Sequence, residues 1–140
     1  MNIDTVFFER CIATLEQAYD LLQSSDVDSI MYEMYRSACV KEFEIILEQS
    51  GKLLKKCLKP YFHSNKAVDK LFFKDIYRYC AQHGLISIDE VSHWLVYRDN
   101  RNNTAHDYGV DFADNTLLLL EQFIIDAKSL AKVINSQPHQ

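Results

Sequence analysis

The sequence of 140 residues is poor in the residues that interrupt regular structure, with three glycines and two prolines. This scarcity counts against a turn-rich β sandwich or barrel and against a glycine-rich phosphate loop. There is no apolar run of about 18 residues to span a membrane, and the first ten residues lack the apolar core of a secretory signal. We therefore expect one domain over residues 1–140 and a cytoplasmic protein without membrane contact.

Cysteine is also sparse, and the sequence contains no Cys-x-x-Cys pair. The four cysteines lie far apart in apolar stretches, which favours buried reduced thiols over a disulfide framework. Histidines are scattered, and Cys80-x-x-His83 is only half of a zinc-binding pattern. The sequence therefore predicts no metal site and implies no other cofactor. The four cysteines are Cys11, Cys39, Cys57 and Cys80.

The net charge of −5 disfavours nucleic acid as a partner, but the charge is unevenly distributed. Residues 51–80 contain eight basic and two acidic side chains, which gives +6 there and leaves −11 for the rest. Within this basic segment, Lys66, Lys70, Lys74 and Arg78 recur every four residues, as along one helical face. The segment predicts a track for RNA or a docking face for an acidic partner, with a solvated helix face as the alternative.

Apolar residues recur at helical spacing in five segments, and no segment alternates as a strand does. We therefore predict an all-α fold, a five-helix antiparallel up-and-down bundle. The aromatic residues Phe72, Phe73 and Tyr77 lie within the basic segment, where they offer faces for stacking bases, but the default assignment places them in the core. Glutamates 42, 44 and 48 are assigned to a solvated face.

The five predicted helices span residues 3–23, 29–58, 66–83, 88–106 and 112–136. The apolar seam of the first helix includes Phe7, and that of the second includes Met34. Ser87 or Asp89 is expected near the start of the fourth helix.

The fourth segment changes character along its length. Its first half is amphipathic, whereas its second half, YRDNRNNTAHDY, has almost nothing to bury. In a helix, Arg98, Asn102 and His106 lie above one another on one face, with Arg101 about 140° around the axis from His106. A helix without an apolar stripe needs another reason for its composition, so this stretch is our candidate site.

The side chains of this stretch suit metal-free cleavage of RNA. An arginine fork binds a phosphate and stabilises negative charge that develops on it, and a histidine transfers protons near neutral pH. No serine or cysteine nucleophile accompanies the histidine, so the attacking group would be the 2′-hydroxyl of the RNA itself. The alternative is an exposed polar helix end whose histidine interacts with the helix dipole.

The run RNNTAH at 101–106 matches the R-N-x-x-x-H signature of HEPN domains, and Tyr108 extends it to R-x4-H-x-Y. This longer form resembles the HepT toxins, which pair with a small nucleotidyltransferase antitoxin of the MntA type. Residues 41–58 and 72–86 resemble the related nucleotidyltransferase substrate-binding proteins. The family also carries its motif near the end of the fourth helix, where this sequence has it.

The resemblance implies a metal-independent endoribonuclease that cleaves RNA, either tRNA or mRNA, in an active site formed at a homodimer interface. Carried over by residue, Arg101 binds the scissile phosphate and His106 is the acid and base. Asn102 orients the phosphate or the histidine. Tyr108 matches the tyrosine that MntA-type partners modify with AMP, which silences the toxin. In a dimer, Arg101 of one protomer would face His106 of the other.

Two further residues, Arg98 and Asn103, are candidates for auxiliary contacts to the substrate. The main alternative function is a binding module, the non-catalytic substrate-binding subunit of a two-component nucleotidyltransferase. Both functions use the same helical bundle, so the fold does not separate them. A purely structural dimer is the third possibility.

Overall fold

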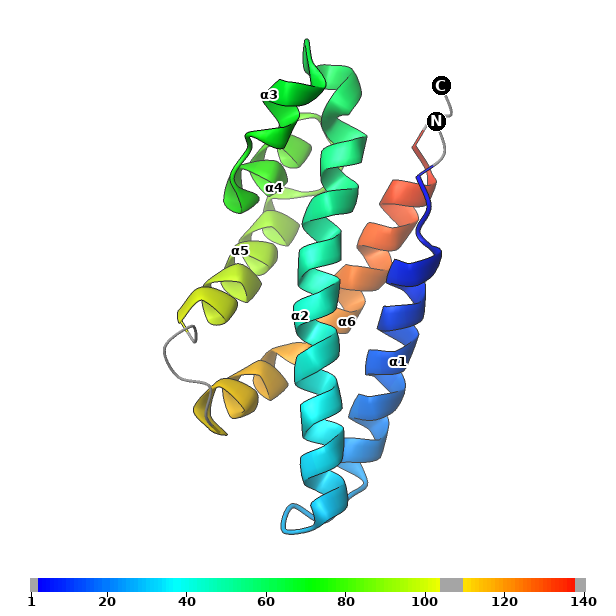
Figure 1. Cartoon of the computed structure of the whole chain (residues 1–140), viewed down its shortest axis with the longest axis vertical. Helices are drawn as coiled ribbons and strands as arrows, with labels where there is room; N and C mark the ends of the chain where they lie inside the picture. The colour runs from blue at the N-terminus through cyan, green and yellow to red at the C-terminus, as the bar shows by residue number, and fades with distance from the viewer. Residues whose placement is uncertain (1–2, 104–109, 138–140) are drawn as a thin grey trace.

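The computed structural model describes residues 3–103 and 110–137, and this part of the chain consists of helices joined by turns, without a strand. The all-α prediction is confirmed, but the described residues form six α-helices rather than five, together with one 3-10 turn (Figure 1). In chain order they are α1 (Val6–Gln23), α2 (Ile30–Leu58), η1 (Lys59–Tyr61), α3 (Asn65–Asp69), α4 (Phe73–Gln82), α5 (Ile88–Asn103) and α6 (Val110–Asn135).

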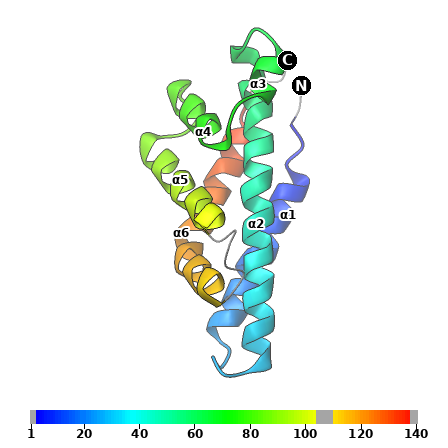
Figure 2. The same ribbon diagram turned by 60° about the vertical axis from the view of Figure 1, so that its left-hand side comes forward.

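The extra helix arises because the segment predicted as one helix over 66–83 is divided into α3 and α4. Val68 of α3 and Tyr77 of α4 are both buried. In one continuous helix these residues would lie about 180° apart, so one of them would face solvent. The chain instead leaves the helical path, with extended backbone at Phe72, and both residues reach the core. Figure 2 shows α3 over the end of α2, and α4 beside α5.

The break also divides the predicted stripe of basic residues. Lys66 lies on α3, whereas Lys74 and Arg78 lie on α4, so the four positions do not share one helical face. The stripe prediction is wrong for this reason, although the segment keeps its excess of positive charge.

The longest helix, α2, lies in the middle of the molecule, with α1 running alongside it in the opposite direction (Figure 1). The other long helix, α6, packs against α1, α2 and α5, so it joins the α1–α2 pair to the helix that carries the candidate site. Although α2 and α6 are long, no helix in the described ranges is apolar enough over its length to cross a membrane.

Most of the predicted apolar seams are buried, with a shift at the start of α1. Phe8 is buried there, while Phe7, which the spacing placed in the seam, is 57% exposed. Around a helix Phe7 lies about 80° from the buried Leu15, whereas Phe8 lies only about 20° from it. Met34 of α2 is also exposed, contrary to the seam predicted for that helix.

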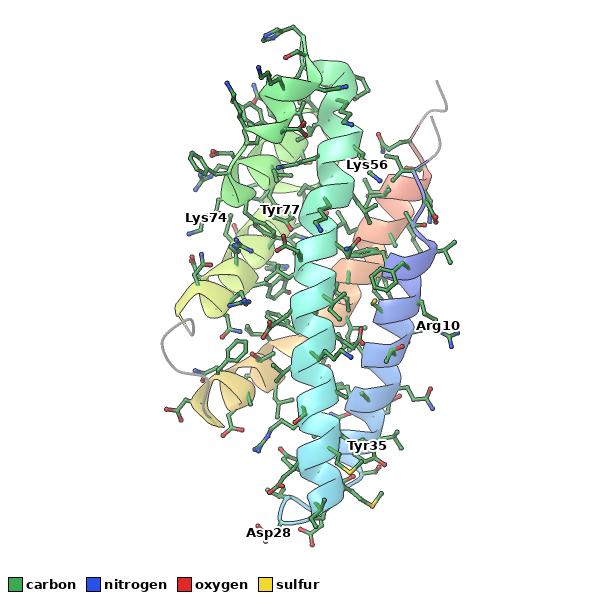
Figure 3. The ribbon with its side chains drawn as sticks, viewed as in Figure 1. Arg10, Asp28, Tyr35, Lys56, Lys74 and Tyr77 are labelled. Carbon is green, nitrogen blue, oxygen red and sulfur yellow. The ribbon has the colours of Figure 1, made fainter. Side chains whose placement is uncertain are left out.

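An aromatic cluster around Trp94 fixes α5 to the rest of the fold. Trp94 is fully buried, and the ring of Tyr77 stacks on it, with centroids 5.4 Å apart and planes 9° from parallel. Phe123 of α6 contacts the indole edge-on, at 5.6 Å between centroids. Figure 3 shows Tyr77 directed toward the interior, while Lys74, one turn earlier on α4, is at the outer surface. Aromatic pairs in these geometries add to the stabilisation from burial alone.

The four cysteines are free and buried, as the sequence predicted. Burial raises the pKa of the Cys39 and Cys57 thiols to about 11. Burial, and then the nearby Glu42 carboxylate, raises the pKa of Cys11 to about 11 as well. These thiols stay protonated at neutral pH and behave as small apolar side chains.

The two ends of the described chain meet. The Thr5 hydroxyl, just before α1, donates a hydrogen bond of 2.8 Å to Oδ1 of Asn135, the last residue of α6. Thr5 is itself buried. A contact between residues 130 positions apart therefore closes the bundle.

Candidate functional site

The helix that carries the motif begins with a reciprocal cap. The Ser87 hydroxyl accepts a hydrogen bond of 3.1 Å from the Glu90 backbone N–H, and Glu90 Oε1 accepts one of 3.1 Å from the Ser87 N–H. This capping box satisfies donors that the first turn of α5 would otherwise leave unpaired. Ser87 was one of two residues that the sequence predicted near this helix start. The cap fixes where α5 begins and therefore which way each later residue faces.

A buried carboxylate fixes α5 against α6. Asp126 is 3% exposed, and its Oδ2 accepts a hydrogen bond from the Tyr97 hydroxyl and lies 3.0 Å from His93 Nδ1. Its Oδ1 accepts a hydrogen bond of 3.0 Å from Gln122 Nε2. Burial, together with the hydrogen bond to this carboxylate, raises the pKa of Tyr97, so the hydroxyl remains a donor. A buried carboxylate is tolerated because these partners replace water.

This contact corrects the view that the second half of α5 has almost nothing to bury. Tyr97, within that half, is 2% exposed and one turn before Arg101. The available sequence signal was an aspartate, Asp126, inside the otherwise apolar seam of α6. One turn further along, the Asn100 side chain donates a hydrogen bond of 3.0 Å to Thr116 Oγ1, which adds a second polar contact between α5 and α6.

Arg98 and Arg101 both face α2. Arg98 Nη1 lies 3.7 Å from Glu48 Oε2, and Arg101 Nε lies 3.5 Å from Glu44 Oε2. Glu44 and Glu48 remain 37% and 59% exposed, in line with the solvated face predicted for them, and they also form ion pairs to α5. The Arg98 and Arg101 side chains remain 26% and 36% exposed. Both ion pairs are longer than a charge-assisted hydrogen bond of about 2.8 Å, so a phosphate can compete with the glutamates.

An open groove of about 400 Å³ lies between the start of α4 and the end of α5. Three of the residues that line it are cations and one is an acid, so the groove is positive on balance. Arg98 and Asn102 both line it, as expected for residues one turn apart on a helix. Its lining comprises Phe72, Phe73, Lys74, Asp75, Arg78, Arg98 and Asn102.

The aromatic residues at this groove differ from one another. Phe73 is half-buried, and the Arg98 guanidinium lies over its ring, 4.1 Å from the centroid, in cation–π geometry. Phe72, assigned to the core from the sequence, is 79% exposed. That assignment is wrong because the extended backbone at Phe72 turns its side chain away from the buried face of α4.

The predicted site extends beyond the end of α5. His106 and Tyr108 lie outside the described residues, and Asn103 is the last residue of α5. Within the described ranges, no group of three or more histidine, cysteine or acidic side chains could hold a metal ion. The Cys80-x-x-His83 pair is divided, because Cys80 is buried in the core while the His83 ring stacks on Tyr61, with centroids 4.1 Å apart.

Comparison with known proteins places these features in a family. Residues 4–136 match the family described as nucleotidyltransferase substrate binding protein like. The chain belongs to this family. The resemblance that the sequence indicated, to HepT-like toxins and to nucleotidyltransferase substrate-binding proteins, is thereby confirmed.

Two comparisons with individual proteins point to different functions, a ribonuclease and a substrate binding domain. A protein of Haemophilus influenzae called probable ribonuclease HepT is 28% identical over 137 residues, which is 98% of this chain and 92% of the relative. A solved structure from the same organism, reported as the fold of a substrate binding domain of a nucleotidyltransferase, has a TM-score of 0.77 and 25% identity. That match covers 94% of this chain and 98% of the other.

Proposed function

We propose that this member of the nucleotidyltransferase substrate binding protein like family is a metal-independent endoribonuclease, the toxin of a pair with a nucleotidyltransferase antitoxin. The observation that carries the proposal is the positive groove whose lining includes Asn102, the chain neighbour of Arg101 in the motif. The similarity over nearly the whole chain to a protein called probable ribonuclease HepT supports the same activity.

In the proposed mechanism the RNA supplies the nucleophile. His106 removes the proton from a 2′-hydroxyl, whose oxygen attacks the adjacent phosphorus and displaces the 5′-oxygen of the next nucleotide. Arg101 pairs with the non-bridging oxygens and stabilises the charge of the transition state, and Asn102 orients the phosphate. The 5′-oxygen leaves with a proton from an imidazolium. The products are a 2′,3′-cyclic phosphate and a 5′-hydroxyl.

A homodimer completes this site in the proposal. Arg101 lies on α5 and His106 follows it by five residues in the sequence, and in the proposed dimer Arg101 of one protomer meets His106 of the other. The same His106, protonated by the 2′-hydroxyl, then gives its proton to the leaving 5′-oxygen, so each site needs one histidine.

The decisive experiment is cleavage of tRNA or mRNA by the purified full chain with EDTA present. We expect cleavage that leaves cyclic phosphate ends, and a loss of at least about a hundredfold in rate for His106→Ala and for Arg101→Ala. The matched control is His63→Ala, because His63 is exposed in the loop before α3 and takes no part in the proposed mechanism. Undiminished cleavage by His106→Ala would overturn the assignment.

The second candidate function, a non-catalytic substrate-binding subunit, is favoured by the solved relative reported as a substrate binding domain. Incubation of the chain with its nucleotidyltransferase and ATP distinguishes the two functions. A silenced toxin gains AMP at Tyr108, seen as a mass increase that is absent in Tyr108→Phe. A substrate-binding subunit instead leaves RNA intact and raises the transfer of nucleotide to a third molecule.

A further inference from the structure

Phe72 is an exposed aromatic residue at the start of α4. Its ring is 79% exposed, although burying a phenylalanine contributes about 1.5–3 kcal/mol to stability. The neighbouring Phe73 supplies the aromatic packing at the start of α4, because its ring packs on Gly51 of α2 and under the Arg98 guanidinium. Of these two adjacent aromatic residues, Phe73 packs between helices, whereas Phe72 presents its ring to solvent.

Three cations line the same groove as this exposed ring. Lys74 and Arg78 are one helical turn apart on α4, and Arg98 reaches the same groove from α5. Lys74 Nζ is paired with Asp99 at 2.6 Å, and Arg78 Nη1 lies 3.4 Å from Asp75 Oδ1. Both side chains are more than a third exposed, so these surface ion pairs contribute little and exchange readily for a phosphate.

The groove leads from Phe72 to the motif, since Asn102 is among its lining residues and is the neighbour of Arg101 in the chain. Proteins bind single-stranded nucleic acid by stacking bases on aromatic rings and pairing phosphates with basic side chains. A groove that combines an exposed ring with several cations has both features. A protein partner is less well matched, because the centre of a protein interface is depleted in charge, and four of the seven lining side chains are charged.

We propose that this groove is a nucleotide subsite for the RNA strand next to the cleavage point. The base of a flanking nucleotide stacks on Phe72, while Lys74, Arg78 and Arg98 hold the phosphates that lead to Arg101. The subsite accepts single-stranded RNA of any sequence, because every base offers a face for stacking. This inference rests on the proposed ribonuclease function and specifies how its substrate is held.

The test measures binding without cleavage, in the full-length His106→Ala background, with a fluorescein-labelled single-stranded RNA 12-mer followed by anisotropy. We expect the added change Phe72→Ala to weaken binding about tenfold, from the loss of one stacked base. Phe72→Trp keeps affinity, and its indole emission is quenched when RNA binds. Arg78→Ala makes binding weaker and its dependence on salt shallower by about one phosphate contact.

The matched control is Phe7→Ala, which removes another exposed phenylalanine, on α1, a helix that packs mainly against α2 and α6. Equal RNA affinity for Phe72→Ala and Phe7→Ala overturns the subsite, even if the wild type cleaves RNA. Loss of nucleotidyltransferase binding by Phe72→Ala, with RNA affinity kept, also overturns it and assigns the groove to that partner. If the His106→Ala protein binds no RNA and the wild type cuts none, the proposed ribonuclease function itself fails.

Discussion

Asp126 has three side-chain partners within a helix whose buried seam is otherwise almost entirely apolar. The Tyr97 hydroxyl is the most buried of its donors, and it lies on α5 one turn before the motif. Removal of one partner from a buried charge costs more than the net value of an ordinary hydrogen bond, because the other partner stays desolvated. Asp126 is therefore the residue on which the position of α5 depends most directly.

We expect Tyr97→Phe to lower the free energy of unfolding by about 1.5–3 kcal/mol, since the carboxylate of Asp126 loses a buried donor. Urea unfolding at neutral pH measures this change. Tyr35→Phe, at the start of α2, serves as the control, and we expect a change within about 0.5 kcal/mol there. Equal losses in the two variants would show that the Asp126 contact does not hold α5.

At the scale of the elements, Gly51 and Phe73 control how closely α4 approaches α2. A Cβ added at Gly51 would lie 2.9 Å from Cε2 of Phe73, closer than real Cβ contacts. The glycine therefore weakens α2 by its own helix propensity but gives the Phe73 ring room to pack. Phe73 in turn supports the Arg98 guanidinium.

We expect Gly51→Ala to reduce stability by about 1 kcal/mol, because the displaced ring costs more than the helix propensity gained. In a Phe73→Ala background the clash is absent, and the same change should raise stability by up to about 1 kcal/mol. Urea unfolding of the four proteins in this double-mutant cycle gives both values. A stabilising Gly51→Ala in the wild type would mean that the ring moves aside freely.

The sequence predicted the extent of the two longest helices, α2 and α6, to within about two residues, because apolar residues recur at helical spacing over most of their length. It failed at residues 70–72, because both halves of 66–83 are locally helical and only the shared core requires the turn between them. The site was predicted in the same uneven way. The placement of Arg98 and Asn102 on one face follows from spacing along α5. The pairing of Arg101 with Glu44, or of Tyr97 with Asp126, depends on packing between distant segments, which no local pattern encodes.

At the scale of the whole molecule, the proposed dimer predicts that inactive variants restore one another. We expect an equal mixture of Arg101→Ala and His106→Ala, after subunit exchange, to recover roughly a quarter of wild-type cleavage. Half of the dimers would then be mixed, and each mixed dimer would have one intact site out of two. Each variant alone is the control. If the mixture stays as inactive as its components, Arg101 and His106 do not work across a dimer interface.

The hydrogen bond between Thr5 and Asn135 has a consequence for the order in which the chain folds. Contacts between α1 and α2 close short loops, whereas those between α1 and α6 close almost the whole chain and cost more entropy. During synthesis α6 is also the last helix to leave the ribosome. A nascent chain thus exposes Arg101 before Asp126, the residue that anchors α5, has left the ribosome. Because Asp126 of α6 holds Tyr97 and His93, we expect α5 to take its final position only after α6 docks, once synthesis is complete.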